Sequence, residues 1–362
     1  MSSKPILIMA GGTGGHVYPA LAVAILLRSK SKNILWLGTH RGLEARLVPN
    51  AGIDLQKISI KGLRKKGLMA LICAPFQLAW ALIQSLTIMI RYRPSLVIGM
   101  GGFVSGPGGI AAWLTRRPLL IHEQNAVAGA TNGILATFAQ VVLQAFPSTF
   151  DSKISAKTVG NPVRQDITNL PSPSERYSPR KGRIRLLILG GSQGALSLNK
   201  KIPAGLGLID PEKRPIVRHQ CGERTFDIAH KAYKDYDVDA ELIPFINEMK
   251  TAYSWADLVI CRAGALTVAE LCAAGLPAIF IPYPSAVDDH QTANAKLMTE
   301  AGAAITIQEH DFTPELLVNI LNDWLQSRSF LLKKANKARS LAQPDSLVQI
   351  TNICLENIGS AS

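Results

Sequence analysis

The residues best suited to chemistry follow a glycine-rich turn near the start of the chain. Gly11–Gly15 holds four glycines with Thr13 between them, and His16 comes directly after it. An apolar run, Ile6–Met9, predicts a buried strand before the turn, and an Ala/Leu-rich helix pattern begins after Pro19. Such a turn lets the backbone approach a ligand closely, and the helix offers N–H groups to an anionic or polar group. His16 is a candidate general base, because imidazole titrates near neutral pH; the alternative is that it only caps the helix or orients the loop.

Two more glycine-rich turns follow strand patterns. Leu186–Ala195 (LLILGGSQGA) repeats the first arrangement in the second half of the chain and includes Ser192. Gly99–Gly109 follows the strand pattern of Pro94–Gly99 and precedes a predicted helix, Ile110–Thr115. Two strand–turn–helix units so far apart predict an α/β protein with two Rossmann-like domains and a cleft between them.

A second candidate base follows another strand. Leu119–His122 reads as a strand that delivers Glu123, Gln124 and Asn125 to the loop after it. The carboxyl ends of parallel strands are where α/β ligand sites form, so Glu123 is the alternative to His16 as the base.

The most informative stretch is residues 258–294. Leu258–Cys261 and Ala278–Ile281 read as strands, and Ala265–Ala274 reads as a short helix between them. Glu270 in this helix has two interpretations: it forms a capping box with Thr267, or it accepts hydrogen bonds from a ribose diol. The spacing alone favours neither.

Two kinds of site are argued against. Neither of the two strand–turn–helix glycine turns completes GxGxxG, and Thr39 and His40 stand where a dinucleotide site needs an acid, so NAD binding is not expected. The acidic run Asp235–Asp239 resembles a metal-binding DxD, but Ala240 and Ile246 stand where a calcium loop needs Gly and Glu. We expect a solvated loop there, and no metal or cofactor.

The charge of the chain is unevenly placed. The net charge is +13, and residues 1–160 hold 17 Lys/Arg against 4 Asp/Glu, whereas residues 161–362 hold 22 of each. A basic first domain predicts an anionic partner. Aromatic residues make up only 6% of the chain and are not interleaved with basic ones. This argues against nucleic acid as the partner and leaves an acidic membrane surface.

The five cysteines show no metal-ligand spacing and read as reduced, mostly core thiols.

The most apolar segment is Leu68–Ile90, which has no charged residue. Its length would suffice for a membrane span, but Pro75, which we expect to begin a helix, divides it, and the strand pattern of the same sheet follows at once. We expect a helix that covers the sheet and turns an outer face to the membrane interface. That face comprises Leu68, Ile72, Phe76, Trp80 and Ile83, ringed by basic residues 61, 64, 65, 66, 91 and 93. At ~1 kcal/mol each, six basic residues give at most roughly 6 kcal/mol, enough for reversible docking.

The domain boundaries follow from composition. Residues 1–163 form the predicted first domain, which ends in VGNPVR, and residues 164–340 form the second. Ser172–Arg183 is rich in Pro, Ser and charge and reads as a solvated linker. Residues 341–362 are expected to form a helix that packs back towards the first domain.

Taken together, the motifs resemble the MurG family of N-acetylglucosaminyltransferases over nearly the whole chain. They are, in order, GGTGGHVYPALA, GMGGFVSGPGG, HEQNAVAGATN, VGNPVR, GGSQGA, RAGALTVAELCAAGLPAIFIPYP and DDHQTANA. The resemblance implies the GT-B architecture and an inverting, metal-independent transfer of N-acetylglucosamine (GlcNAc) from UDP-GlcNAc to lipid I (undecaprenyl-pyrophosphoryl-MurNAc-pentapeptide), giving lipid II. It implies a peripheral enzyme on the cytoplasmic face of the bacterial inner membrane, with cell-wall synthesis or division proteins as further partners.

The resemblance also implies residue roles. Arg164 would lie near the pyrophosphate, Ser192 would bind phosphate, Ile246 would hold uracil through its main chain, Glu270 would bind ribose, and Gln291 would reach the sugar hydroxyls. The other donor contacts would be Thr13, Gly14, Gly15, Asn125, Ala265, Leu266, Thr267, Val268 and Ala269. Phe103 stands where many members have Tyr in the Gly99–Gly109 loop, which we assign to acceptor binding without that hydroxyl.

Two rival functions remain open at this point. One is another UDP-sugar enzyme of the same fold, such as an epimerase, which would not need the basic and apolar region of residues 61–93. The other is a membrane-surface scaffold that binds a nucleotide sugar without turnover, against which the intact set Arg164, Ser192, Glu270 and Gln291 argues.

Overall fold

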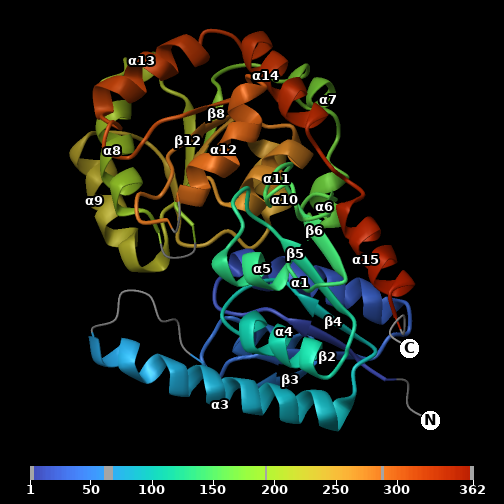
Figure 1. Ribbon diagram of the computed structural model, residues 1–362. Helices are drawn as coiled ribbons and strands as arrows, with labels where there is room; N and C mark the ends of the chain where they lie inside the picture. Colours follow the sequence, from blue (N-terminus) through green and yellow to red (C-terminus); the bar gives the residue numbers. More distant parts are fainter. Residues whose placement is uncertain (1–3, 61–67, 192–193, 287–288, 359–362) are drawn as a thin grey trace. The chain divides into compact units, whose positions relative to one another are not determined.

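The structure is a computed structural model that describes residues 4–60, 68–191, 194–286 and 289–358, with the backbone alone for residues 68–72. The chain divides into two compact units (Figure 1). The first unit comprises Met1–Pro162 together with Asp345–Ser362, and the second comprises Val163–Pro344.

The first unit is built on a seven-stranded parallel sheet with the order β3-β2-β1-β4-β5-β6-β7. The strands are β1 (Ile6–Met9), β2 (Ile34–Gly38), β3 (Asp54–Lys57), β4 (Leu96–Gly99), β5 (Leu119–Glu123), β6 (Val141–Gln144) and β7 (Ala156–Thr158). The strand order reverses between β1 and β4, and ligands of such sheets bind beyond the carboxyl ends of the strands at this point. Two glycine turns begin there: Gly11–Gly15, called the first glycine turn, and Gly99–Gly109, called the third. The turn in Leu186–Ala195 is called the second.

Helices cover both faces of this sheet. On one face α1 (Gly14–Ser29), α2 (Glu44–Asn50) and α15 (Ser346–Glu356) pack on a buried cluster that includes Ile8 and Ile350. On the other face α3 (Leu68–Tyr92), α4 (Ser105–Leu114) and α5 (Ala130–Leu135) pack on a cluster that includes Leu7, Met9 and Val97.

Two helices begin earlier than the sequence predicts. Helix α1 starts at Gly14, with Pro19 inside it, and α4 starts at Ser105 rather than Ile110. Pro19 is the sixth residue of α1, so the helix lacks the hydrogen bond that an N–H at this position would make. Pro19 is buried with Val17 and Ala20, and this packing offsets the loss. The glycine turns are therefore shorter than predicted, and part of each lies in the first turn of its helix.

Helix α3 is a single 25-residue helix with Pro75 inside it, so the prediction that Pro75 begins a helix is wrong. Ala81, Ser85 and Met89 are fully buried on its inner side, and Ala81 and Met89 belong to the core cluster on that face of the sheet. Within the described part of the chain, α3 is the one helix whose length and composition would allow it to cross a membrane, with 28% of its most apolar window buried.

The second unit repeats the plan with a six-stranded parallel sheet in the order β10-β9-β8-β11-β12-β13. Its strands are β8 (Arg185–Leu189), β9 (Ile216–Gln220), β10 (Glu241–Ile243), β11 (Leu258–Cys261), β12 (Ala278–Phe280) and β13 (Ala304–Thr306). Its helices are α6 (Gln165–Thr168), α7 (Pro173–Tyr177), α8 (Leu196–Gly207), α9 (Phe226–Asp235), α10 (Met249–Trp255), α11 (Ala265–Ala274), α12 (His290–Glu300), α13 (Pro314–Trp324) and α14 (Arg328–Ser340). The order reverses between β8 and β11, so the second glycine turn and the start of α11 flank the switch point.

The stretch Ser172–Arg183 is not the solvated linker that its composition predicts. Ser172 and Glu175 form a capping box that starts α7, and Arg176 and Tyr177 in that helix are buried. Arg176 donates hydrogen bonds to main-chain carbonyls of the second unit, including that of Gly275 at 2.9 Å. Buried carbonyl groups need hydrogen-bond donors, and Arg176 supplies them. Its guanidinium is therefore buried inside the second unit instead of remaining in water.

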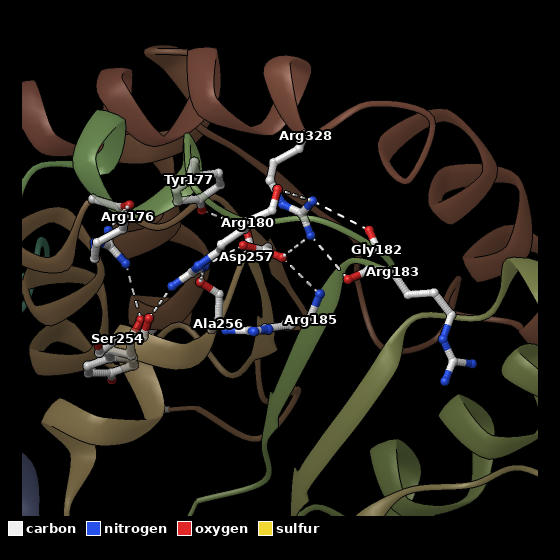
Figure 2. Close-up of polar contacts among 12 residues, drawn as sticks. Arg176, Tyr177, Arg180, Gly182, Arg183, Arg185, Ser254, Ala256, Asp257 and Arg328 are labelled. Atoms are coloured by element: carbon white, nitrogen blue, oxygen red, sulfur yellow. Dashed lines mark hydrogen bonds and ion pairs between the residues drawn. The ribbon is translucent and has the colours of Figure 1, made fainter.

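The buried carboxylate of Asp257 organises the amino-terminal ends of the strands in the second sheet (Figure 2). Asp257 is fully buried directly before β11, pairs with Arg180, and accepts hydrogen bonds from Arg328 Nη2 at 3.1 Å and from the backbone N–H of Arg185 at 3.0 Å. The hydroxyl of Tyr177 donates to the carbonyl of Asp257 at 2.7 Å. This network fastens α7 and α14 to the start of the strands whose other ends form the candidate site.

Candidate functional site

The first glycine turn is fixed by a carboxylate that the sequence analysis did not single out. Glu44, fully buried at the start of α2, accepts hydrogen bonds from the backbone N–H of Gly12 at 3.0 Å and of Thr39 at 2.9 Å. Thr13 is the N-cap residue of α1, and Gly14 and Gly15 supply the N–H groups of its first turn. The turn can therefore present backbone donors to an anionic or polar ligand, as predicted, but the role itself stays a prediction.

The third glycine turn lies against the first. A Cβ on Gly102 would be 2.2 Å from the carbonyl oxygen of Gly11, and one on Gly101 would be 2.6 Å from Nδ1 of His16. Both glycines have positive φ angles, 94° and 84° for Gly101 and Gly102, which other residues rarely adopt. Phe103 follows with its side chain half exposed.

His16 points to the loop after β5. Its Nδ1 lies 2.8 Å from Oε1 of Gln124, and Gln124 Nε2 lies 3.0 Å from Nδ1 of His122. His122 and Gln124 are buried, whereas His16 is partly exposed. The structure therefore brings the first and the HEQN motifs together around one imidazole ring.

Glu123, the alternative base, accepts hydrogen bonds from residues of the loop that follows it. Its Oε1 accepts from the backbone N–H and the side-chain amide of Asn125 at 3.0 and 3.1 Å. Its Oε2 accepts from the N–H of Gly129 at 3.2 Å and from Asn132 Nδ2 at 2.9 Å. A buried carboxylate with this many donors orders the loop, which favours His16 over Glu123 as the base. Asn125, a predicted donor contact, is held by the same carboxylate.

In the second unit Glu270 and Thr267 form no capping box, so that interpretation is wrong. Gly264 is the N-cap residue of α11, which places Thr267 in the third position and Glu270 in the sixth. The helix starts directly after the strand–helix turn, so Ala265, Leu266 and Thr267 supply its first N–H groups, with Val268 and Ala269 following.

Glu270 is instead part of a polar group at the side of α11. Its Oε2 accepts from the hydroxyl of Tyr253 at 2.9 Å, and its Oε1 lies 3.9 Å from Nη2 of Arg164, the N-cap residue of α6. The Glu270 side chain is 19% exposed and that of Arg164 is 47% exposed. Burial raises the pKa of the Glu270 carboxyl, while the Tyr253 hydroxyl and the Arg164 guanidinium oppose this rise. A mostly buried carboxylate beside a half-exposed cation is suited to a diol and a neighbouring phosphate.

The second glycine turn is tight where it meets the neighbouring loop. Gly194 has a φ of 77°, and a Cβ there would be 2.4 Å from the carbonyl oxygen of Cys221. Ser192, the predicted phosphate ligand, lies outside the described residues. The turn follows β8 at the switch point of the sheet, as the sequence predicts.

Two more predicted donor contacts follow neighbouring strands. Ile246 is partly buried in the loop between β10 and α10. Gln291 lies in the first turn of α12, where its Oε1 accepts from the backbone N–H of Tyr283 at 2.9 Å. That bond fixes the amide, so its Nε2 group is the part available to donate to a sugar hydroxyl.

Arg262 is a structural residue at the carboxyl ends of the strands in the second sheet, and the sequence motifs did not point to it. It follows β11, pairs with Glu309, and donates to the carbonyl of Ile281 at 2.9 Å and to the Ser197 hydroxyl at 3.2 Å. Arg262 therefore links the ends of β11 and β12 to α8 and to the loop after β13. Its position directly after a buried strand was the one signal for it in the sequence.

The described residues contain no group of three or more His, Cys, Asp or Glu side chains that could hold a metal ion. Asp235 ends α9, and Asp237 has a left-handed φ of 50° in the turn after it. The predicted absence of a metal stays a prediction.

The outer face of α3 is apolar where its side chains are described. Phe76 is 77% exposed, Trp80 55% and Ile83 52%. Leu68 and Ile72 lie among the residues whose side chains are not described, and the basic residues at 61, 64, 65 and 66 lie outside the described residues. Arg91 and Arg93 are exposed at the other end of the helix.

The chain resembles known proteins over nearly its full length. Residues 6–144 match the N-terminal domain of glycosyltransferase family 28, and residues 185–350 match its C-terminal domain. The UDP-N-acetylglucosamine–N-acetylmuramyl-(pentapeptide) pyrophosphoryl-undecaprenol N-acetylglucosamine transferase of Marinobacter nauticus is 51% identical over 353 residues, which cover 98% of this chain and 97% of the relative. The transferase of the same name from Alkalilimnicola ehrlichii is 51% identical over 354 residues, with 98% and 99% covered.

Solved structures agree. The crystal structure of Acinetobacter baumannii MurG has a TM-score of 0.86 at 40% identity and covers 98% of this chain and 99% of its own. A UDP-glucose:anthocyanidin 3-O-glucosyltransferase in complex with UDP has a TM-score of 0.70 at 14% identity, with 99% and 100% covered, and this likeness shows the fold alone. The predicted α/β architecture of two Rossmann-like domains is confirmed. The chain therefore belongs to the MurG family of N-acetylglucosamine transferases, within glycosyltransferase family 28.

Proposed function

We propose that this chain transfers N-acetylglucosamine from UDP-GlcNAc to the muramoyl C4 hydroxyl of lipid I, with inversion at the anomeric carbon and without a metal ion. The product is lipid II, the precursor of peptidoglycan. The observation that supports this best is the polar group of Arg164, Tyr253 and Glu270 beside the N-terminus of α11, in a chain of this family.

The second unit binds the donor in this proposal. Glu270 accepts hydrogen bonds from the ribose diol, because among the described residues the one contact of its Oε1 is with Arg164 Nη2, at 3.9 Å. The first N–H groups of α11 and the second glycine turn, with Ser192, bind the diphosphate. Ile246 holds uracil through its main chain, and Gln291 donates to the sugar.

The reaction needs positive potential at the leaving group. When the anomeric carbon is attacked, UDP departs with a growing negative charge on its β-phosphate. The positive end of the α11 dipole and the Arg164 guanidinium stabilise that charge without a metal ion.

The acceptor hydroxyl needs a base, and His16 supplies it in this proposal. A positioned base contributes typically ~10²–10⁴-fold to the rate. Thr13, Gly14 and Gly15 offer backbone groups next to it, and the Gly99–Gly109 turn, with Phe103, binds the acceptor.

Lipid I is a membrane lipid, so the enzyme must reach a membrane surface. We assign this role to the exposed apolar face of α3 with its flanking basic residues, which together suit an anionic leaflet. The enzyme is then peripheral, on the cytoplasmic face of the inner membrane.

The experiment is transfer of radiolabel from UDP-GlcNAc to a lipid I analogue. We expect labelled lipid II with UDP-GlcNAc, little product with UDP-N-acetylgalactosamine, and the same rate in EDTA. Folded protein that gives no heat with UDP-GlcNAc in calorimetry, and no transfer, would overturn the proposal. Activity that is lost in EDTA and restored by magnesium would overturn its metal-free part.

A further inference from the structure

A chain of hydrogen bonds leads from His16 through two buried side chains to the backbone. His16 Nδ1 lies 2.8 Å from Gln124 Oε1, and Gln124 Nε2 lies 3.0 Å from His122 Nδ1. His122 Nε2 lies 2.9 Å from the carbonyl oxygen of Gly160. We propose that Gln124 and His122 are positioning residues that hold His16 in the tautomer with hydrogen on Nδ1 and a lone pair on Nε2.

The direction of the chain is set at its far end. The carbonyl oxygen of Gly160 can only accept, so His122 Nε2 is the nitrogen that bears hydrogen. Burial lowers the pKa of His122 and keeps its ring neutral. A neutral ring that is protonated on Nε2 has a lone pair on Nδ1, so His122 accepts a hydrogen bond from Gln124.

The amide of Gln124 can adopt only one orientation. Its Nε2 lies 3.0 Å from His122 Nδ1 and also 3.0 Å from the main-chain oxygen of His122, and both of these atoms are acceptors. The flipped amide would turn an oxygen towards two lone pairs. The backbone is anchored too, because Asn161 Nδ2 donates to the carbonyl of Gln124 at 2.9 Å. Gln124 Oε1 therefore faces His16.

An amide oxygen can only accept, so the hydrogen of this last bond is on His16 Nδ1. The ring has little room to turn away, because Gly101 lies so close that a Cβ there would be 2.6 Å from the same Nδ1. Nε2 is left as the nitrogen that can take a proton. The inference rests on the proposed function for its consequence, which is that Nε2 accepts the proton of the acceptor hydroxyl.

Glutamine differs from a carboxylate in this position. A carboxylate next to Nδ1 would stabilise the imidazolium and would repel the lone pair of His122. The neutral amide relays the choice of tautomer from Gly160 without adding a buried charge. This explains why three polar side chains are packed in series with one donor and one acceptor at each contact.

The direct test is the nitrogen spectrum of the histidine rings. In protein labelled with ¹⁵N-histidine, long-range ¹H–¹⁵N correlations distinguish protonated from unprotonated ring nitrogens. The signals of His16 are those that disappear in His16→Gln. We expect neutral His16 to be protonated on Nδ1 alone; a ring protonated on Nε2, or a mixture of tautomers, would overturn the proposal.

The second test removes the acceptor with Gln124→Met, which keeps the side-chain volume. We expect mixed His16 tautomers and a fall in kcat of ~10–100-fold, part of what a base contributes, with KM for UDP-GlcNAc almost unchanged. Gln140→Met is the matched control. Gln140 is exposed and directly precedes β6, so it lies at the amino-terminal end of the strands, whereas Gln124 follows the carboxyl end of β5. We expect this control to keep the wild-type kcat and the single tautomer.

The outcomes separate this inference from the proposed function. Unchanged kcat in Gln124→Met, or a rise in KM alone, would overturn the positioning role. Normal turnover of His16→Gln would remove His16 as the base, whereas the wild-type spectrum would still decide the tautomer. If Gln124→Met does not fold, that spectrum decides the inference by itself.

Discussion

At the scale of single residues, Glu270 combines a cost to stability with its proposed role in donor binding. Its pKa is raised by burial, so the carboxyl ionises at lower pH in the unfolded chain than in the folded protein. Stability is therefore lost as the pH rises from the unfolded pKa through the folded one, and the loss is complete at neutral pH. Shifted pKa values of this kind are frequent at functional sites, which agrees with the proposed role in donor binding.

We predict that Glu270→Gln weakens UDP-GlcNAc binding about 10- to 100-fold, because hydrogen bonds to a charged group contribute about 1.5–3 kcal/mol. The same change should make the protein more stable at pH 7, and this gain should vanish below about pH 4, where both side chains are neutral. Calorimetry and thermal unfolding measure the two effects, with the exposed Glu212→Gln as control. Wild-type affinity for the donor would contradict the ribose role.

The residue types showed which side chains could act as a base, but not which of them already accept hydrogen bonds from other parts of the chain. Glu123 and His16 were equally visible in the sequence, and only the structure shows Glu123 saturated by Asn125, Gly129 and Asn132. Glu44 had no motif around it, because its partner Gly12 lies 32 positions away. Hydrogen bonds between distant segments cannot be inferred from local spacing.

At the scale of elements, the turn between β8 and α8 offers a test of why its glycines are needed. Gly191 and Gly194 have nearly the same φ, 78° and 77°. A Cβ on Gly191 would meet no atom of the described residues within 4 Å, whereas one on Gly194 would be 2.0 Å from Thr225 Oγ1 and 2.4 Å from Cys221 O. The pair separates backbone strain from collision.

We predict that Gly191→Ala costs about 1–2 kcal/mol, the strain of a left-handed alanine. Gly194→Ala should cost about 1–3 kcal/mol more, because the turn must also move away from Cys221. Thermal unfolding gives the stabilities, and titration with UDP reports whether either change weakens the proposed binding of phosphate by the turn. Equal losses in the two variants would show that collision is not what restricts Gly194.

The buried Asp257 gives a second prediction at this scale, because it joins α7 and α14 to the sheet (Figure 2). Asp257→Asn leaves Arg180 and Arg328 without their charge partner, and breaking a buried ion pair costs about 3–5 kcal/mol. Glu241→Gln is the control, since the Glu241 side chain is 54% exposed and its pair with Arg218 should contribute at most about 1 kcal/mol. Similar midpoints of thermal unfolding for the two variants would contradict the role of this network.

Strands were easier to predict than helix starts or linkers. The apolar runs at Ile6–Met9 and Leu258–Cys261 are buried strands, as predicted, because a parallel sheet covered on both faces requires continuous apolar sequence. Pro19 and Pro75 misled the prediction, since each lies inside a helix whose packing outweighs one lost hydrogen bond. The polar stretch Ser172–Arg183 is packed because its arginines find buried acceptors.

At the scale of the whole molecule, the chain separates its charge. All of the net +13 lies in residues 1–160, where two of the four acidic side chains, Glu44 and Glu123, are buried and hydrogen-bonded, and the other two, Asp54 and Asp151, are exposed. Basic residues near an anionic leaflet contribute ~1 kcal/mol each, and this attraction is screened by salt. The apolar face of α3 adds a contribution that salt does not weaken.

We predict that the protein co-sediments with vesicles that contain anionic lipid, and that salt reduces this binding. Phe76→Ser, Trp80→Ser and Ile83→Ser together remove the described side chains of the predicted outer face of α3. At about 1 kcal/mol for each partly buried side chain, the triple variant should bind about 100-fold more weakly at any salt concentration. Its affinity for UDP-GlcNAc should not change, because none of the predicted donor contacts lies in α3.

The matched control for this surface lies in the second unit. Leu208→Ser, Ile216→Ser and Ile228→Ser remove three side chains that are 60%, 42% and 39% exposed, so they also reduce the exposed apolar surface, although by less than the α3 variant does. If general hydrophobicity caused vesicle binding, both triple variants would lose part of it. If α3 is the docking surface, only the α3 variant loses it, and only that variant loses transfer to lipid I in vesicles while keeping transfer to a soluble, short-chain analogue. Binding that is indifferent to anionic lipid would contradict the contribution of the basic first domain.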